Sequence, residues 1–209
     1  MIIKVCGMRE AENIASIALL KPDFMGFIFY SFSSRDVSTS LLKEIVDKVP
    51  KDIKKVAVFV NENLENVLSI IKEYGFSCVQ LHGNESVEYC KSIKETGISV
   101  IKVFSIQTSL DFDLIEKYDD VADYYLFDTK SPKHGGTGQK FDWTLLENYR
   151  SQKPVLLSGG INSEDVQQVK DIVEKFPFIK GLDLNSKFEI SPAIKDSDKL
   201  ESFIRAVRD

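Results

Sequence analysis

Short apolar runs recur along the chain at nearly regular intervals. Eight of them can be marked, at residues 2–6, 24–30, 55–60, 77–81, 99–104, 124–128, 154–157 and 179–184, and they are rich in β-branched and aromatic residues. Their starts lie 22 to 31 residues apart, which is enough for one crossover helix between consecutive strands and little more. The pattern therefore predicts parallel strands that alternate with helices.

Several segments between these runs have the period of an amphipathic helix. The apolar stripes are Ala11, Ile14, Ala15 and Ala18 after the first run, Leu64, Val67, Leu68 and Ile71 after the third, and Leu200, Phe203, Ile204 and Val207 at the end. Such a stripe presents one face for packing onto a sheet. Residues 110–118 show a weaker form of the same pattern.

Eight strand–helix units in 209 residues predict an α/β fold, a single (β/α)8 TIM barrel with a closed, parallel eight-stranded sheet and outer helices. We expect one domain over residues 1–209, because no linker-like stretch divides the sequence. The alternative is an open doubly wound sheet. The first predicted strand is followed by Cys6-Gly7-Met8 rather than a dinucleotide-binding glycine motif, which favours the barrel.

Composition narrows the function classes. Hydrophobic residues make up 43% and charged residues 28% of the chain, and the net charge is −5, which disfavours a nucleic-acid partner. No apolar run approaches the roughly 18 residues of a membrane span, and the first ten residues turn polar too early for a signal peptide. Three cysteines without close spacing predict neither a disulfide framework nor a zinc site. We expect a cytoplasmic protein without membrane contact.

In a barrel, all strand C-terminal ends meet at one rim, where the active site lies. The polar residues at these ends are Cys6, Asn61, His82, Asp128, Ser158-Gly159-Gly160 and Asn185-Ser186. Asp128 also precedes a loop with Gly135, Gly136 and Gly138. Closure of such a loop would expel water and raise the carboxyl pKa, as a general acid requires. Asp128 as the cap of an ordinary turn is the alternative.

These strand ends resemble the phosphoribosylanthranilate isomerase family, barrel enzymes of tryptophan biosynthesis. The motifs that carry the resemblance occur in the family's order along the whole chain: KVCG, GFIF with SSR, VAVFVN, VQLHG, FDT with GGTG and FDW, SGGI, GLDLNS and IKD. Each motif alone is weak, but the ordered set is specific.

The resemblance implies an Amadori rearrangement of a phosphorylated sugar–anthranilate substrate, without cofactor or metal, in a monomer or homodimer. Cys6 matches the general base and Asp128 the general acid. A basic thiol must lose its proton, so we expect the local field to lower the pKa of Cys6. The distance from its sulfur to the Asp128 carboxyl should be about 5–9 Å, by analogy with other sugar chemistry. Taken alone, Cys6 would be a small buried hydrophobe.

The resemblance also assigns binding roles. Gly159, Gly160, Asn185 and Ser186 match the phosphate loops, and a helix expected to begin near Asn162-Ser163 would add N–H donors. Asn185 stands where the family commonly has serine, and Lys187 where it commonly has glycine. Lys187 could therefore contact the phosphate or point to solvent, and the sequence does not decide between these alternatives.

Arg35 matches the arginine that binds the anthranilate carboxylate, although the neighbouring Asp36 could engage it instead. His82 and Asp183 are further candidate substrate contacts with structural alternatives. Asn61 is expected to cap the next helix and Asp142 the helix after the glycine-rich loop. Lys130, Lys133, His134 and Lys140 could attract an anionic substrate, or form an ordinary solvated loop.

Two other functions remain possible. The histidine-pathway isomerase performs the same rearrangement on a substrate with two phosphates, but only the second half of this chain carries a Gly-Gly phosphate signature. A non-catalytic barrel that binds phosphorylated metabolites would have no reason to place Cys6 opposite Asp128.

Overall fold

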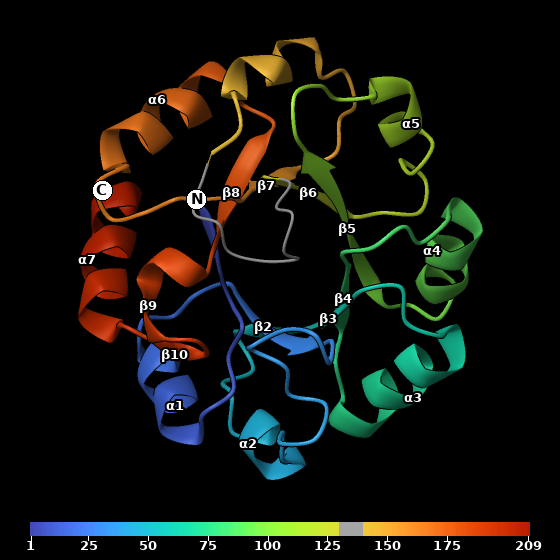
Figure 1. Cartoon of the computed structure of the whole chain (residues 1–209), viewed down its shortest axis with the longest axis vertical. Helices are drawn as coiled ribbons and strands as arrows, with labels where there is room; N and C mark the ends of the chain where they lie inside the picture. The colour runs from blue at the N-terminus through green and yellow to red at the C-terminus, as the bar shows by residue number, and fades with distance from the viewer. Residues whose placement is uncertain (130–139) are drawn as a thin grey trace.

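The protein, described here by a computed structural model that covers residues 1–129 and 140–209, forms a closed barrel of parallel strands surrounded by helices (Figure 1). The barrel strands are β1 (Ile2–Cys6), β2 (Phe24–Phe29), β3 (Lys54–Phe59), β4 (Cys78–Leu81), β5 (Ser99–Ile106), β6 (Tyr124–Thr129), β7 (Val155–Leu157) and β8 (Ile179–Leu184). They pair in sequence order, and β8 closes the ring onto β1. The predicted TIM barrel is confirmed, and each predicted strand boundary agrees within two residues.

The outer layer contains α1 (Ala11–Leu19), α2 (Lys43–Asp47), α3 (Leu64–Tyr74), α4 (Val87–Lys94), α5 (Phe112–Glu116), α6 (Val166–Lys175) and α7 (Ser197–Arg208). Two 3-10 helices, η1 (Trp143–Asn148) and η2 (Ser186–Phe188), lie before β7 and after β8. A hairpin of β9 (Glu189–Ser191) and β10 (Ile194–Lys195), which the apolar pattern did not indicate, follows η2. No helix among the described residues is long and apolar enough to cross a membrane.

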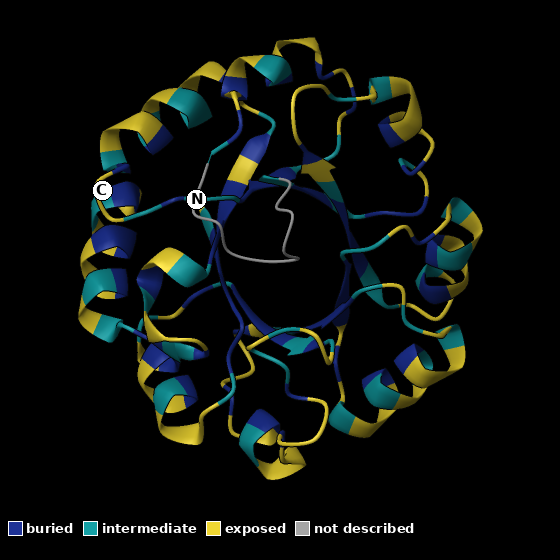
Figure 2. Cartoon of the chain, in the orientation of Figure 1, coloured by how far each residue is buried: buried dark blue, intermediate teal, exposed yellow. Residues whose placement is uncertain are grey.

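Alternation along the strands divides the core in two. Side chains that point outward pack against the helices, whose buried faces turn toward the ring (Figure 2). The smaller cluster fills the barrel and comprises Cys6, Phe24, Val56, Val58, Cys78, Ile101, Val103, Leu126 and Leu156. Among the described residues, the barrel is therefore filled by side chains below its rim, and the site lies at the rim above them.

Several local expectations need correction. The helix expected near Asn162-Ser163 begins instead at Val166, because Asp165 turns back to accept a hydrogen bond from the Asn162 N–H at 2.7 Å. The helix after β3 is capped by Asn63, whose side chain accepts from the Glu65 N–H, and not by Asn61. Asp142 does cap the following helix, η1.

Candidate active site

A cavity of about 800 Å³ opens at the C-terminal ends of the barrel strands. The residues that the sequence assigns to catalysis or substrate binding all line this cavity, although they come from five strand ends and one loop spread over 180 positions. The loop at residues 130–139, with Lys130, Lys133, His134 and the three glycines, lies outside the described residues. Lys140 pairs with Asp165 and Gln168, so it is held at the helical shell.

Cys6 ends β1 and lies on the inward face of the barrel, 3% exposed. Gly26 stands opposite it on β2, and a Cβ atom at Gly26 would come within 2.8 Å of the Cys6 sulfur. The absence of a side chain there makes room for the thiol. All three cysteines, including Cys78 and Cys90, are free and buried.

The expectation that the pKa of Cys6 is lowered is wrong. Burial raises the pKa of the thiol and outweighs the ammonium of Lys4, which lowers it. The carboxylate of Asp183 adds to the increase, and the ammonium of Lys195 opposes it. The site therefore holds Cys6 mainly as a thiol near neutral pH, and the basic form becomes common only in alkaline solution.

This pKa shift predicts the pH dependence of turnover. If the thiolate is the base, the active form increases as pH rises toward the raised pKa. We expect the thiolate fraction to increase by about tenfold per pH unit below that pKa, and kcat/KM to rise with it wherever the Asp128 carboxyl group keeps the proton that it must donate. The measurement is kcat/KM at several pH values with freshly generated substrate and correction for its spontaneous decay. A steady fall between about pH 6 and 8 would contradict a thiolate base.

Asp128 lies near the end of β6 and is separated from Cys6 by β7 and β8 in the ring. The His82 Nε2 atom is 3.4 Å from the Asp128 Oδ2 atom. On its other side, His82 Nδ1 is 3.2 Å from the amide nitrogen of Gln80. If that amide donates to Nδ1, the hydrogen of the neutral ring lies on Nε2, the atom that approaches Asp128. Sequence reasoning missed Gln80, although its spacing two residues before His82 places both on one face of the chain.

Arg35 does not engage Asp36. Its guanidinium forms a bidentate ion pair with Glu189, at 2.8 Å from Nε to Oε1 and 2.5 Å from Nη2 to Oε2. Asp36 instead accepts hydrogen bonds from the Tyr30 N–H and from Ser38. The pair with Glu189 raises the pKa of Arg35 and occupies one edge of its planar fork.

Glu189 also binds Lys195, whose ammonium lies 2.6 Å from Glu189 Oε1 and 2.6 Å from Asn185 Oδ1. Burial lowers the pKa of Lys195 to about 8, against the attraction of Glu189. Burial acts to raise the pKa of Glu189, but hydrogen bonds from Arg35 and the charge of Lys195 hold it below its usual value. Sequence analysis missed both residues. The IKD motif contained Lys195, but nothing in the sequence indicated its partner.

Two backbone segments, after the neighbouring strands β7 and β8, line the cavity next to each other. Gly159 and Gly160, after β7, have φ values of +89° and +70°, which favour glycine, and Asn185 and Ser186 follow β8. Gly159 packs directly on Thr129, so a Cβ atom there would be 2.2 Å from Thr129 Oγ1. Since α6 begins only at Val166, the loop after β7 rather than the start of α6 lines the cavity here. Lys187 is exposed and lines the same cavity.

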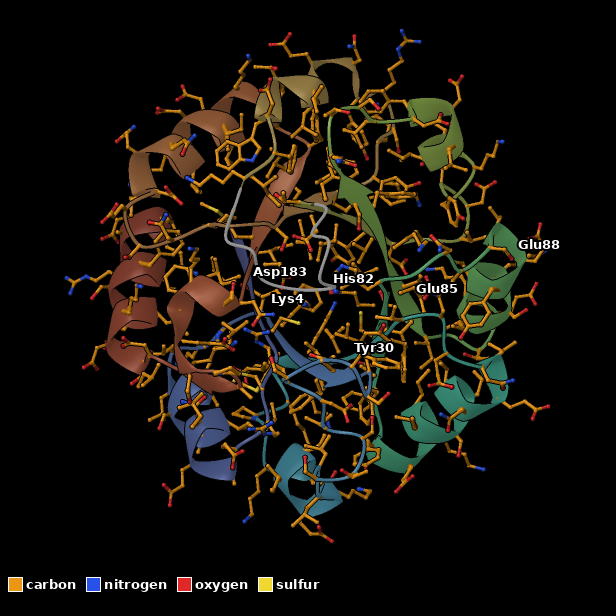
Figure 3. All side chains as sticks on the ribbon, viewed as in Figure 1. Lys4, Tyr30, His82, Glu85, Glu88 and Asp183 are labelled. Atoms are coloured by element: carbon orange, nitrogen blue, oxygen red, sulfur yellow. The ribbon has the colours of Figure 1, made fainter. Side chains whose placement is uncertain are left out.

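Asp183 lies deeper, at the inner end of the site. It accepts a hydrogen bond from the Lys4 ammonium at 2.7 Å and one from Ser158 Oγ at 3.2 Å. Figure 3 shows Lys4, Asp183 and His82 in the middle of the ring of strands. Within residues 1–129 and 140–209, no cluster of His, Cys, Asp and Glu side chains could hold a metal ion.

Comparison with known proteins agrees with this geometry. Residues 3–206 match the sequence model of the family described as N-(5'-phosphoribosyl)anthranilate (PRA) isomerase. The N-(5'-phosphoribosyl)anthranilate isomerase of Parabacteroides distasonis is 43% identical over 208 residues, which cover 99% of this chain and 93% of that protein. That of Caldanaerobacter subterraneus is 38% identical over 99% of this chain and 97% of the relative.

Solved structures give the same result. The phosphoribosyl anthranilate isomerase of Thermotoga maritima superposes with a TM-score of 0.86 at 33% identity, over 100% of this chain and 99% of that one. A phosphoribosyl anthranilate isomerase in complex with reduced 1-(o-carboxyphenylamino)-1-deoxyribulose 5-phosphate superposes with a TM-score of 0.83 at 30% identity, over 100% and 99% of the two chains. Sequence, barrel and rim together show that this chain belongs to the N-(5'-phosphoribosyl)anthranilate isomerase family.

Proposed function

We propose that this protein catalyses the Amadori rearrangement of N-(5'-phosphoribosyl)anthranilate, with Cys6 as general base and Asp128 as general acid. The observation that carries the proposal is that a thiol and a carboxyl group from separate strands line one cavity, beside glycine-rich loops suited to a phosphate. The relative solved with a reduced deoxyribulose 5-phosphate compound supports the substrate class.

In the proposed mechanism, the Asp128 carboxyl protonates the furanose ring oxygen. The C1–O bond breaks, and the nitrogen lone pair forms a Schiff base. The Cys6 thiolate then takes the proton from the second sugar carbon, which gives an enolamine that tautomerises to the ketone. The rearrangement moves hydrogen within the substrate, so it has no net oxidation and needs only an acid and a base.

The other residues hold the substrate and the acid. The Gly159-Gly160 and Asn185-Ser186 segments offer backbone N–H groups to the phosphate. The edge of Arg35 that Glu189 leaves open would bind the anthranilate carboxylate. We place His82 against Asp128, where its Nε2–H orients the carboxyl group, and Asp183 at the base of the site.

The first half of the barrel argues against a substrate with two phosphates. The Glu85 carboxylate, 5% exposed, already accepts the N–H of Asn61 at 2.9 Å and that of Gly83 at 3.0 and 3.1 Å. Lys102 neutralises this carboxylate at 2.8 Å. A second phosphate at the ends of β3 and β4 would meet a carboxylate instead of free N–H donors, which disfavours the histidine-pathway activity.

Turnover can be tested directly. The labile substrate is generated enzymatically from anthranilate, and the decay of its fluorescence is followed with and without this protein. We expect a rate that is proportional to protein concentration and well above the spontaneous background. A decay equal to that background would reject the proposed function, and faster turnover of the two-phosphate substrate would favour the histidine-pathway reaction.

The phosphate loop gives a second test. Gly159→Ala would place a methyl group 2.2 Å from Thr129 Oγ1 and 2.7 Å from Thr129 N at a positive φ. The loop must move, so we expect KM to rise about tenfold or more, which corresponds to about 1.4 kcal/mol of lost binding. The control is Gly75→Ala, at φ +65° with no atom within 4 Å of the new Cβ, which shares the backbone strain but not the clash. An unchanged KM in Gly159→Ala would contradict the phosphate assignment.

We also propose that the protein works in the cytoplasm as a monomer or homodimer. Three free cysteines fit a reducing compartment, and the Thermotoga maritima relative is described as dimeric. Light scattering coupled to size-exclusion chromatography distinguishes these assemblies from higher ones.

A further inference from the structure

Lys4 is a buried charge that the proposed mechanism does not use. It lies on β1 inside the barrel, with no exposed surface, and its ammonium pairs with Asp183 at 2.7 Å (Figure 3). It is not among the residues that line the cavity. Removing a lysine from water costs several kcal/mol, and an ion pair in a barrel core rarely recovers more than this cost. The ion pair of Lys4 with Asp183 is therefore not explained by stability alone.

Strand geometry places Lys4 directly beside Cys6. The two residues are two positions apart on β1, so both side chains point into the barrel. Gly26 of β2 stands opposite Cys6, and a Cβ built on it lies 2.8 Å from the Cys6 sulfur and 3.2 Å from the Lys4 ammonium nitrogen. The Cys6 sulfur and the Lys4 ammonium therefore both lie next to the space that a side chain at position 26 would occupy. Any side chain at position 26 would separate or displace them.

Lys4 is itself held from the opposite side. One carboxylate oxygen of Asp183 accepts its hydrogen bond, and the other accepts from Ser158 Oγ at 3.2 Å. The charged groups that act on the Cys6 sulfur are Lys4 on β1, Asp183 on β8, Lys195 on β10 and Arg35 after β2. Of the two lysines, Lys4 lowers the pKa of Cys6 more, and Cys6 in turn helps to raise the pKa of Lys4.

We propose that Lys4 is a positioning residue for Cys6: its ammonium, anchored by Asp183 and seated over Gly26, donates a hydrogen bond to the sulfur, orients it and stabilises the thiolate. This role rests on the proposed function of Cys6 as the base. Lys4 keeps its proton throughout, and the proton taken from the sugar carbon resides on sulfur. The ammonium compensates the negative charge that would otherwise be isolated in the barrel when the thiol ionises.

The test uses a readout that is independent of turnover. Alkylation of Cys6 by iodoacetamide is measured by mass spectrometry of its peptide across pH 6 to 11, in the wild type and in Lys4→Met. Since only the thiolate reacts, the midpoint of the profile reports its ionisation. We expect the midpoint in Lys4→Met to rise by at least about one pH unit, which is a tenfold loss of thiolate at a given pH. We also expect kcat to fall at least about tenfold, with KM changed less than about threefold.

Lys102→Met is the matched control. Lys102 of β5 is also buried and pairs with Glu85 at 2.8 Å, but it is not among the groups with the largest effect on the pKa of Cys6. It reports the general cost of breaking a buried ion pair in this barrel, and the Cys6 midpoint should stay within about 0.3 pH units of the wild type. An equal shift in Lys102→Met would overturn the proposal, because the effect would then not be specific to Lys4.

If Lys4→Met does not fold because Asp183 is left unpaired, the double variant Lys4→Met/Asp183→Asn removes both charges. Its alkylation midpoint should still lie above that of the wild type, because Lys4 affects the sulfur more than Asp183 does. An unchanged midpoint, or a shifted midpoint with unchanged kcat, would overturn the proposal. Failure of the proposed function would appear separately: the wild type would show no turnover, while its Cys6 alkylation midpoint would still lie below that of Lys4→Met.

Discussion

Replacing Cys6 by alanine is expected to lower kcat at least about a hundredfold, or about 2.7 kcal/mol of transition-state stabilisation, and to leave the barrel folded. The Cys6 thiolate is the only base that we assign to remove the proton from the second sugar carbon. The Cβ atom of Cys6, which alanine retains, contributes little to substrate binding. KM should therefore change less than kcat. The measurement is steady-state kinetics with the fluorescent substrate, accompanied by circular dichroism to confirm the fold.

Cys90→Ala is the matched control for this variant. Cys90 is also a free, fully buried thiol, but it lies on α4 outside the cavity. Its replacement can cost stability through a small void, yet kcat should stay within about twofold. Near-normal turnover in purified Cys6→Ala, or an equal loss in Cys90→Ala, would contradict the assignment of Cys6 as the base.

Replacing Asp128 by alanine is expected to have an effect of the same size, at least about a hundredfold on kcat. Without the carboxyl group, nothing protonates the ring oxygen, and His82 loses the acceptor that lies 3.4 Å from its Nε2 atom. Asp128→Asn retains the shape and the contact with His82 but has no transferable proton. Both variants should therefore fail to the same extent if proton donation, rather than packing, is the function.

Asp47→Asn controls for the loss of one negative charge. Asp47 lies on α2, where it pairs with Lys43 on the surface, and its replacement should leave kcat unchanged. A ring-opened substrate analogue offers a further check, because an acid needed only for ring opening should not affect its reaction. If Asp128→Asn retained most of the wild-type turnover, the acid would have to be another residue.

Much of the architecture could be predicted from local patterns. Apolar runs spaced for crossover helices indicated eight parallel strands, and alternation along each strand indicated which residues face inward. Because such strands place their C-terminal ends at one rim, Cys6 and Asp128 could be assigned to one site although 122 positions separate them. The boundaries of α6 and the β9–β10 hairpin were not predicted, since a turn centred on Asp165 and a short two-stranded ribbon leave little periodic signal.

The electrostatics of the site could not be predicted in this way. The neighbour of Arg35 in sequence, Asp36, is not its partner; Glu189, 154 positions away, is. The expected fall in the pKa of Cys6 was wrong in sign, because the extent of burial depends on how tightly the neighbouring strands pack around the sulfur. Lys4 appeared only as part of a motif, and its proximity to Cys6 depends on Gly26 of the adjacent strand.

The sequence by itself determined the barrel, the family and the set of groups that reach the rim, because these follow from periodicity and from the ends of parallel strands. Only the tertiary structure decided which charged side chains pair, which backbone amide groups can bind a phosphate and whether the buried thiol keeps its proton. Those properties depend on distances of a few ångströms between segments far apart in the chain, where burial and Coulomb forces are strong and opposed.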